Sequence, residues 1–352
     1  MRIVVTGATG NVGSSLLDAL CAEPAVDSVL GLARRVPETV PARWAAKVEL
    51  AAVDVVTDDL ASRFAGADAV VHLAWVIQPS RRVEVLHATN VVGSSRVFRA
   101  AGEAGVASLV YASSVGAYSP GPKDRPVDEA WPTDGIPSSF YARHKAAVER
   151  RLDELEAARP RVRVVRLRPG LIFKREAASS IQRLFLGRLV PVRALRPKLI
   201  PAVPRVDRLI FQAVHTEDVA EAYRLALTNP EARGAYNIAA DPVLDPAELG
   251  RVLGARPLPL PAPVLRTGAD LTWRLGLQPT PSGWLDMGLS VPVMDTTRAR
   301  TELGWTPRHS AADALLDLLD GFAHRAEGPT PALQRYSKPP KEAEEAEVRA
   351  AA

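Results

Sequence analysis

The chain has 352 residues, which is too long for one simple core and predicts two lobes. Hydrophobic residues make up 47% and charged residues 24%, so the composition excludes a disordered or fibrous chain. The formal net charge of +4 comes mostly from scattered arginines, without the basic blocks and interleaved aromatic residues that are typical of nucleic-acid binding. We therefore expect a globular protein with a small-molecule ligand and no nucleic-acid partner.

Cysteine content and hydropathy predict the compartment. Cys21 is the only cysteine, which excludes an intramolecular disulfide and a cysteine-ligated zinc site and fits a reducing environment. Strand-like residues begin almost at Met1, so we expect no secretory signal. No run approaches the roughly 20 apolar residues that a membrane-spanning helix needs. The sequence therefore predicts a cytoplasmic protein with no membrane span.

The first element is a short apolar strand that leads directly into a glycine-rich turn and a helical pattern. Gly7 and Gly10 leave no Cβ between the backbone and a pyrophosphate, and Gly13 lets the helix pack close to the sheet. The free N–H groups at the start of the helix would point at the anion. This turn predicts a dinucleotide site. The residues expected to contact the dinucleotide here are Thr6, Gly7, Gly10, Asn11, Val12 and Gly13.

Apolar strand-like runs alternate with helical patterns over residues 1–168, which predicts an α/β class Rossmann domain, a doubly wound parallel sheet. The expected strands are Ile3–Thr6, Ser28–Ala33, Val48–Val53, Ala69–Leu73, Ser108–Ala112 and Val162–Leu167. Over residues 169–325 the alternation weakens and prolines increase, which indicates mainly a smaller C-terminal substrate lobe, with some segments returning to the sheet. Residues 326–352 have few apolar anchors and are expected to form a disordered tail.

Two arginines follow the second expected strand and bear on the choice of cofactor. In NAD-preferring sites an acid at this point binds the ribose 2′-hydroxyl, whereas an arginine accommodates a 2′-phosphate. Ala33 stands where the acid would be, and Arg34 and Arg35 follow it. The sequence therefore predicts NADP(H) as the preferred cofactor, with NAD(H) as the alternative if these arginines are solvated surface charges.

Tyr141 and Lys145 lie in a helical segment that Ser138 or Ser139 caps. Their i, i+4 spacing puts both side chains on one face. A nearby ammonium group stabilises a phenolate and lowers the pKa of tyrosine from its ordinary value of about 10. Such a tyrosine can pass protons to a substrate oxygen. The pair follows the expected strand Ser108–Ala112, whose C-terminal serines can position a hydroxyl.

Taken in order, Thr6-Gly7-x-x-Gly10-x-x-Gly13, Tyr111-Ala-Ser-Ser114 and Tyr141-x-x-x-Lys145 resemble the short-chain dehydrogenase/reductase family. The glycine spacing is similar to that of the extended branch, which includes nucleotide-sugar epimerases and dehydratases. The resemblance implies that Tyr141 is the general acid/base, that Lys145 lowers its pKa and binds the nicotinamide ribose, and that Ser114 holds the reacting oxygen, with Ser113 as the neighbour to check. The further cofactor contacts that it implies are Asp54, Val55, Leu73, Ala74, Asn90, Pro169 and Gly170.

The resemblance also bears on partners and on the histidines. It implies a homodimer formed through the helices around Asn90 and Tyr141, although the residues themselves do not reveal the oligomeric state. His215 lies in a segment that is similar to a family landmark, Val214-His-Thr-Glu-Asp-Val219, and is expected to make a structural hydrogen bond. His144 is expected to face away from Tyr141 and Lys145. Nothing in the sequence calls for a metal.

The substrate stays open because the chain departs from the nucleotide-sugar members. Those members usually carry an Asn and then a Gly after the sixth strand, where this chain has Leu171 and Lys174. Their arginine before the His of the landmark is replaced around residues 211–213, although Arg205 or Arg208 could take that role. Residues 181–190 have apolar residues at helical spacing, which predicts an amphipathic helix over the cleft or, alternatively, a wall for a hydrophobic substrate.

Three functions compete. The leading hypothesis is an NAD(P)-dependent oxidoreductase that transfers hydride to or from a secondary alcohol or ketone, assisted by Ser114, Tyr141 and Lys145. The alternative is a nucleotide-sugar epimerase or dehydratase, which keeps its cofactor and recycles the hydride. The third is a non-enzymatic, NADP-binding redox sensor, against which the intact Ser114, Tyr141 and Lys145 argue.

Overall fold

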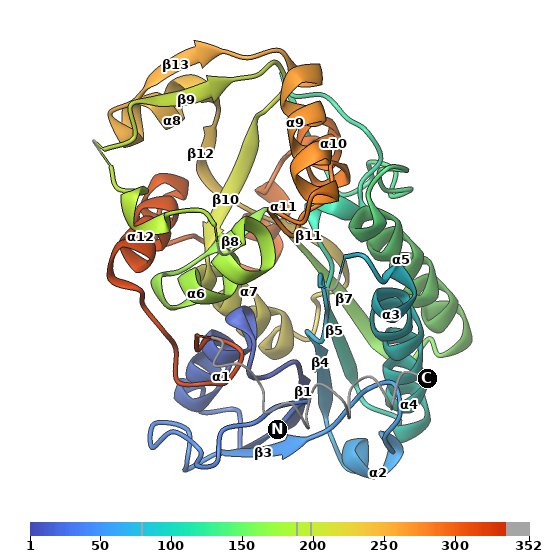
Figure 1. Cartoon of the computed structure of the whole chain (residues 1–352). Coiled ribbons are helices and arrows are strands. Elements are labelled where there is room, and N and C mark those ends of the chain that lie inside the picture. Colours follow the sequence, from blue (N-terminus) through green and yellow to red (C-terminus); the bar gives the residue numbers. More distant parts are fainter. Residues whose placement is uncertain (79, 188, 198, 336–352) are drawn as a thin grey trace.

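A seven-stranded parallel sheet lies at the centre of the molecule (Figure 1). The computed structural model describes residues 1–335 except for residues 79, 188 and 198. The strands of this main sheet are β1 (Arg2–Thr6), β2 (Ser28–Ala33), β3 (Val48–Ala52), β4 (Ala69–His72), β5 (Ser108–Ala112), β7 (Arg163–Pro169) and β11 (Gly234–Ile238). Their order is β11-β7-β5-β4-β1-β2-β3, with every pairing parallel. The chain winds outward from β1 in both directions, which is the predicted doubly wound Rossmann arrangement.

Helices cover both faces of the main sheet. On one face lie α1 (Asn11–Ala22) and α7 (Thr216–Thr228), and on the other lie α2 (Ala61–Phe64), α4 (Ser94–Ala104) and α5 (Phe140–Ala158). The helix α3 (Val83–His87) and the π-helix η1 (Ala88–Gly93) lead into α4. Ile3 and Val5 pack under α1 and α7, whereas Val4 between them packs with the opposite layer. This alternation is the period of two expected of a strand that is buried on both faces.

The remaining elements form smaller sheets and helices above one edge of the main sheet (Figure 1). The small sheets comprise β8 (Leu171–Phe173), β10 (Phe211–His215) and β12 (Ala240–Leu244); β9 (Ala202–Arg205) and β13 (Arg256–Pro259); and β6 (Pro126–Val127) and β14 (Val293–Met294). The helices are α6 (Ala178–Ile181), α8 (Pro246–Leu253), α9 (Ala262–Arg274), α10 (Gly283–Ser290), α11 (Thr297–Glu302) and α12 (Ala311–His324). Short 3-10 or π turns are η2 (Val115–Ala117), η3 (Arg175–Ala177), η4 (Gln182–Leu186) and η5 (Val192–Ala194). Although β11 comes from the range predicted for the lobe, it lies in the main sheet.

The amphipathic helix predicted over residues 181–190 is shorter than expected. Helical structure runs through α6 and η4 and ends at Leu186. Gly187 follows with φ +76°, a left-handed conformation that breaks the helical pattern and favours glycine. Leu189 beyond it is 68% exposed, and residue 188 lies outside the described residues. The apolar spacing continued past a glycine that ends the helix, so the prediction was wrong for the last residues.

The predicted disordered tail begins too early. Thr330 is fully buried, and its hydroxyl donates a hydrogen bond to the carbonyl of Thr9 at 2.7 Å. Leu333 is also buried. Thr330 therefore holds this segment to the start of the chain, and the carbonyl of Ala326 accepts a hydrogen bond from the Ser179 hydroxyl of α6 at 3.1 Å. The polar composition obscured these contacts. Residues 336–352 lie outside the described residues. Among the residues described, we find no helix with the length and apolar character needed to cross a membrane.

Candidate active site

The predicted site residues follow the C-terminal ends of strands in the main sheet. Parallel strands end at a common edge, which is where open α/β sheets bind their ligands. The glycine-rich turn follows β1, Leu73 follows β4, Ser114 follows β5 and Gly170 follows β7. This topology brings residues from distant parts of the sequence to one edge.

The glycine-rich turn has a geometry that only glycine allows. Gly7 has φ +74°, and a Cβ there would lie 2.7 Å from the backbone nitrogen of Ala74. A Cβ on Gly13 would lie 2.4 Å from the carbonyl oxygen of Gly7. Gly13 therefore lets α1 lie close to the turn, whereas the sequence analysis expected this close approach to be to the sheet. Gly10 is the N-cap of α1 and provides no side-chain cap. The first N–H groups of α1 are thereby left for an anion, which fits the pyrophosphate of a dinucleotide.

Two predicted contact residues of this region hold the turn in place. The hydroxyl of Thr6 lies 2.7 Å from Nδ1 of His72, whose Nε2 lies 2.8 Å from the hydroxyl of Ser94. Burial, with a smaller effect of Lys145, lowers the pKa of His72 to about 3, so the ring is neutral. The Asn11 carboxamide accepts a hydrogen bond from the Thr216 hydroxyl at 3.1 Å. Thr6 thus joins β1 to β4, and Asn11 joins α1 to the start of α7.

Val12 and Asn90 also have structural contacts. Val12 packs against the core on the α1 face of the sheet. The side chain of Asn90 is buried; it accepts a hydrogen bond from the N–H of Val76 and donates one to its carbonyl, both at 2.8 Å. Asn90 therefore fixes the segment after β4, whose residues Leu73 and Ala74 lie against Gly7. Asn90 is thus a positioning residue for this part of the site.

The segments after β2, β3 and β7 also reach this edge. Arg34 and Arg35 follow β2 and are both exposed. Asp54 is half-buried, and its carboxylate accepts a hydrogen bond from the N–H of Val56 at 2.8 Å. The neighbouring Val55 is buried against the start of α4.

Pro169 ends β7, and Gly170 follows it at a close crossing. A Cβ on Gly170 would lie 2.4 Å from the carbonyl oxygen of Gln212 in β10. Gly170 is therefore needed for β10 to approach the main sheet, which is a packing reason for the glycine in addition to the predicted cofactor contact.

Tyr141 and Ser114 lie side by side. Ser139 caps α5 by accepting a hydrogen bond from the N–H of Ala142 at 3.3 Å, so α5 begins just before Tyr141. Ser114 accepts a hydrogen bond from the N–H of Gly116 at 3.0 Å and is also hydrogen-bonded to Tyr141. Burial raises the pKa of Tyr141 to about 12, although the bond to Ser114 partly offsets this rise.

Lys145 does not lower the pKa of Tyr141, which corrects the expectation from the sequence. Its Nζ donates to the carbonyl of Ala112 at 2.5 Å and lies 3.5 Å from the ring centre of Trp75, but 5.8 Å from the ring centre of Tyr141. Burial also lowers the pKa of Lys145 well below its ordinary value, against an opposing effect of Glu149. The ammonium group is thus held by the end of β5 and an indole face instead of by the phenol oxygen.

Ser113 belongs to a buried ionic network and not to the Tyr141 side. Its hydroxyl donates to Glu149 at 2.5 Å, and Glu149 accepts two hydrogen bonds from Arg168, each at 3.0 Å. Arg166 lies 3.2 Å from the same carboxylate. Of the two candidate serines, Ser114 is the one beside Tyr141.

Aromatic rings surround Tyr141, and of these the sequence analysis indicated only Phe185, as part of the apolar residues 181–190. The ring centre of Trp284 lies 4.8 Å from that of Tyr141, and the ring centre of Trp75 lies 5.8 Å away. Phe185 packs edge-on against Trp284 at 4.9 Å. Within the described part of the chain, the buried indole N–H groups of Trp75 and Trp284 have no hydrogen-bond partner. Trp75 directly follows the predicted contact Ala74, so its position was a usable signal, whereas no motif marks Trp284.

Comparison with curated proteins gives long but distant matches. An uncharacterized protein of Mycobacterium tuberculosis is 27% identical over 322 residues, which cover 90% of this chain and 29% of that protein. This chain therefore spans less than a third of that relative. A UDP-glucose 4-epimerase of Mycolicibacterium smegmatis is 37% identical over 158 residues, which cover 42% of this chain and 49% of the relative.

Solved structures share the fold. A UDP-glucose 4-epimerase of Thermus thermophilus in complex with NAD superposes with a TM-score of 0.64 at 23% identity, over 92% of this chain and 99% of the other. The family model described as "NAD dependent epimerase/dehydratase family" matches residues 3–239, which is more than half of the chain. The chain therefore belongs to the NAD-dependent epimerase/dehydratase family, whose members are enzymes.

Proposed function

We propose that this protein is an NAD(H)-dependent enzyme that oxidises a hydroxyl-bearing carbon of a nucleotide sugar and reduces it again in the same turnover. The observation that carries the proposal is the hydrogen-bonded pair of Ser114 and Tyr141, with Lys145 near it, at the edge where the glycine-rich turn lies. The match to a UDP-glucose 4-epimerase supports the substrate class. This was the alternative in the sequence analysis, and the comparisons support it better than the leading hypothesis.

In the proposed reaction the cofactor transfers the hydride, and the residues of the site bind the ligands and transfer the proton. The nicotinamide of bound NAD(H) would supply the hydride acceptor and donor. The N–H groups of α1 would hold the pyrophosphate, and Lys145 would bind the nicotinamide ribose. Tyr141 would accept the proton of the substrate hydroxyl during oxidation and return it during reduction, while Ser114 holds the same oxygen.

A second candidate is net reduction of a ketone on an apolar substrate. The rings of Trp75, Trp284 and Phe185 favour it, because they give the Tyr141 side of the site an apolar wall. With a pKa of about 12, Tyr141 carries its proton, which is the state that protonates a ketone oxygen. The redox-sensor hypothesis has no support in the comparisons.

One experiment separates these candidates. Purified protein is denatured to release any retained cofactor, and native protein is incubated with UDP-glucose, UDP-glucuronic acid or dTDP-glucose, or with apolar ketones plus NADH. A new sugar nucleotide without net change in the absorbance of reduced nicotinamide supports the first function. Consumption of NADH with a ketone supports the second. Turnover in neither assay counts against both.

We propose NAD(H) as the cofactor rather than NADP(H). The NAD complex of the Thermus thermophilus neighbour supports this choice, and the NADP(H) preference expected from Arg34 and Arg35 has no support among the comparisons. Both side chains are exposed after β2, as solvated surface charges are. The homodimer and the cytoplasmic location stay predictions.

For cofactor binding, we expect NADH to bind at least as tightly as NADPH in a fluorescence titration. Arg34→Ala and Arg35→Ala should leave the Kd for NADH unchanged, because neither side chain is needed for a 2′-hydroxyl. Arg63→Ala, an exposed arginine at the end of α2, is the control for a general change in surface charge. Tighter binding of NADPH that either Arg34 or Arg35 variant abolishes would restore the original expectation.

The raised pKa of Tyr141 predicts different pH profiles for the oxidation step and the reduction step. Burial raises this pKa to about 12, so the protonated phenol persists through neutral pH. Reduction needs the phenol, and its rate should stay level from about pH 6 to 10; oxidation needs the phenolate, and its rate should rise about tenfold per pH unit. Single-turnover rates of each hydride-transfer step across this range test it. A reduction rate that falls with an apparent pKa near neutrality would contradict it.

A further inference from the structure

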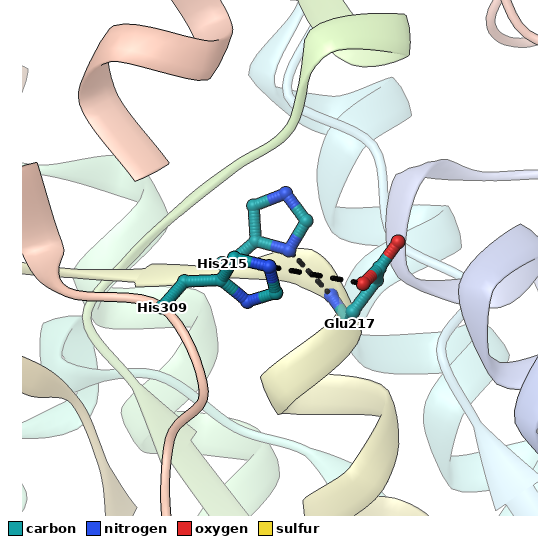
Figure 2. A group of neighbouring side chains, drawn as sticks. All are labelled: His215, Glu217 and His309. Atoms are coloured by element: carbon teal, nitrogen blue, oxygen red, sulfur yellow. Dashed lines mark hydrogen bonds and ion pairs between the residues drawn. The ribbon is translucent and has the colours of Figure 1, made fainter. Parts of the chain in front are cut away.

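Two histidines and a glutamate gather at a point that has no role in the proposed reaction (Figure 2). His215 ends β10, Glu217 is in the first turn of α7, and His309 directly precedes Ser310, the N-cap of α12. One nitrogen from each ring and one carboxylate oxygen of Glu217 lie within 4.8 Å of one another. Glu217 is exposed, whereas His215 is buried and His309 is half-buried.

A carboxylate fixes the orientation of His309. Its Nδ1 lies 3.0 Å from Oδ2 of Asp218, which also accepts the backbone N–H of His309 at 3.0 Å. A carboxylate only accepts, so Nδ1 carries the proton and the lone pair is on Nε2. That Nε2 faces Oε2 of Glu217 at 4.0 Å, as Figure 2 shows.

His215 is held in the same way. Its Nδ1 accepts the backbone N–H of Glu217 at 3.3 Å, and an ion bound at this nitrogen would replace that hydrogen bond (Figure 2). Its Nε2 lies 3.3 Å from Oδ2 of Asp317. Each histidine thus has a carboxylate on the nitrogen that faces away from Glu217. This is the arrangement by which proteins orient histidines that bind metal ions.

The distance between Nε2 of His309 and Oε2 of Glu217 is close to the distance between two atoms that bind the same metal ion. At 4.0 Å it is too long for a hydrogen bond, and it brings a lone pair to face a carboxylate. Metal bonds of about 2.0–2.2 Å that meet at a tetrahedral ion put two ligand atoms about 3.4 Å apart. The exposed Glu217 side chain needs to move by only a few tenths of an ångström to close that distance.

We propose that His215, Glu217 and His309 bind a divalent transition-metal ion, with zinc as the best fit. Two imidazole nitrogens and one carboxylate oxygen form a donor set that zinc prefers, whereas magnesium and calcium prefer oxygen ligands alone. The three residues line a pocket of about 490 Å³, which leaves space for water as a fourth ligand. The ion would join β10 and α7 to the segment that leads into α12.

The surrounding charges favour a cation. Asp313, Asp317 and Asp320 line the same pocket. Arg175 also lines it and pairs with Asp320 at 2.6 Å, so these two charges offset each other and Asp313 and Asp317 keep the pocket acidic. The sequence did not indicate this site, because His215 and Glu217 are remote from His309 in the chain and form no short ligand motif with it.

The test is zinc binding by the untagged full-length chain after treatment with EDTA. Calorimetry with zinc chloride should give one site, and cobalt(II) should give the visible bands of a low-symmetry site. Glu217→Gln and His309→Gln should each weaken zinc binding by about tenfold or more. Zinc should also raise the melting temperature of the unmodified chain, and Glu217→Gln should remove that rise. Magnesium should not compete.

Matched controls test whether binding is specific. Glu176→Gln removes a carboxylate that lines the same pocket, and His324→Gln removes an exposed histidine of α12, and both should leave the zinc affinity unchanged. Absence of saturable 1:1 binding overturns the proposal. So does binding that Glu217→Gln and His309→Gln do not weaken, or that the two controls weaken equally. Since Glu217 is exposed, its variant tests the site without disturbing the core.

Discussion

Tyr141→Phe is expected to lower turnover by about 10²–10⁴-fold, the usual loss when a general acid/base is removed. The phenyl ring keeps its packing against Trp284 and Trp75, so the fold and the melting temperature should stay close to those of the unmodified protein. Only the hydroxyl, and with it the hydrogen bond to Ser114, is lost. Steady-state rates with the substrate identified by the screen, together with NADH titration, provide the measurement.

A second tyrosine provides the control for Tyr141→Phe. The Tyr236 hydroxyl donates to Glu302 at 3.0 Å, and Tyr236 packs in the core below the lobe. Tyr236→Phe should therefore leave turnover unchanged while removing a hydroxyl of the same kind. If Tyr141→Phe retained more than about one-tenth of the turnover, Tyr141 would not be the proton donor.

Glu149→Gln is expected to lower the free energy of unfolding by about 3–5 kcal/mol, because it removes the shared carboxylate from two buried arginines. The side chain of Glu149 is 4% exposed, and those of Arg166 and Arg168 are each 7% exposed. In this setting the guanidinium of Arg168 would lose its charged partner, and the two arginines would repel each other. Urea unfolding provides the measurement. Glu154→Gln, in an exposed pair with Arg151, should cost less than about 1 kcal/mol.

The lowered pKa of Glu149 also predicts that stability depends on pH. Burial raises the pKa of Glu149, but attraction and hydrogen bonds from Arg168 outweigh it, so the pKa lies below its ordinary value. A lowered carboxyl pKa stabilises the fold above the unfolded value of about 4.3, and this contribution is lost as the pH falls through the folded pKa. Glu149→Gln should flatten this part of the stability profile. If Glu149→Gln lowered the free energy of unfolding by less than about 1 kcal/mol at neutral pH, the ionic network of Glu149, Arg166 and Arg168 would not have the stabilising role argued for it.

The Rossmann domain could be predicted closely because its determinants are local. Buried apolar runs mark strands such as Ala69–His72, and the C-terminal ends of parallel strands lie at one edge of the sheet whatever the loops do. The i, i+4 spacing of Tyr141 and Lys145 was also read correctly as one helix face. It does not say where the ammonium points, and here Ala112 and Trp75 hold it away from the phenol. The direction of the pKa shift of Tyr141 could therefore be determined only from the structure.

The lobe was less predictable because its contacts join remote segments. Trp284 reaches Tyr141 from α10, and His309 meets His215 across the end of β10. Neither approach leaves a periodic pattern or a short motif in the chain. The packed segment after residue 325 was missed for the same reason, since Thr330 finds its partner at Thr9.

The order of the main sheet has a consequence for folding during synthesis. Each strand after β1 pairs with a strand that the ribosome has already made: β2 and β4 with β1, β3 with β2, β5 with β4, β7 with β5, and β11 with β7. The sheet can therefore grow outward as the chain emerges. In contrast, β6 must wait for β14, and β9 must wait for β13. A nascent chain halted after β11 would carry a complete main sheet, but β6 and β9 would still lack their partner strands. Unpaired strands of this kind are sites for aggregation.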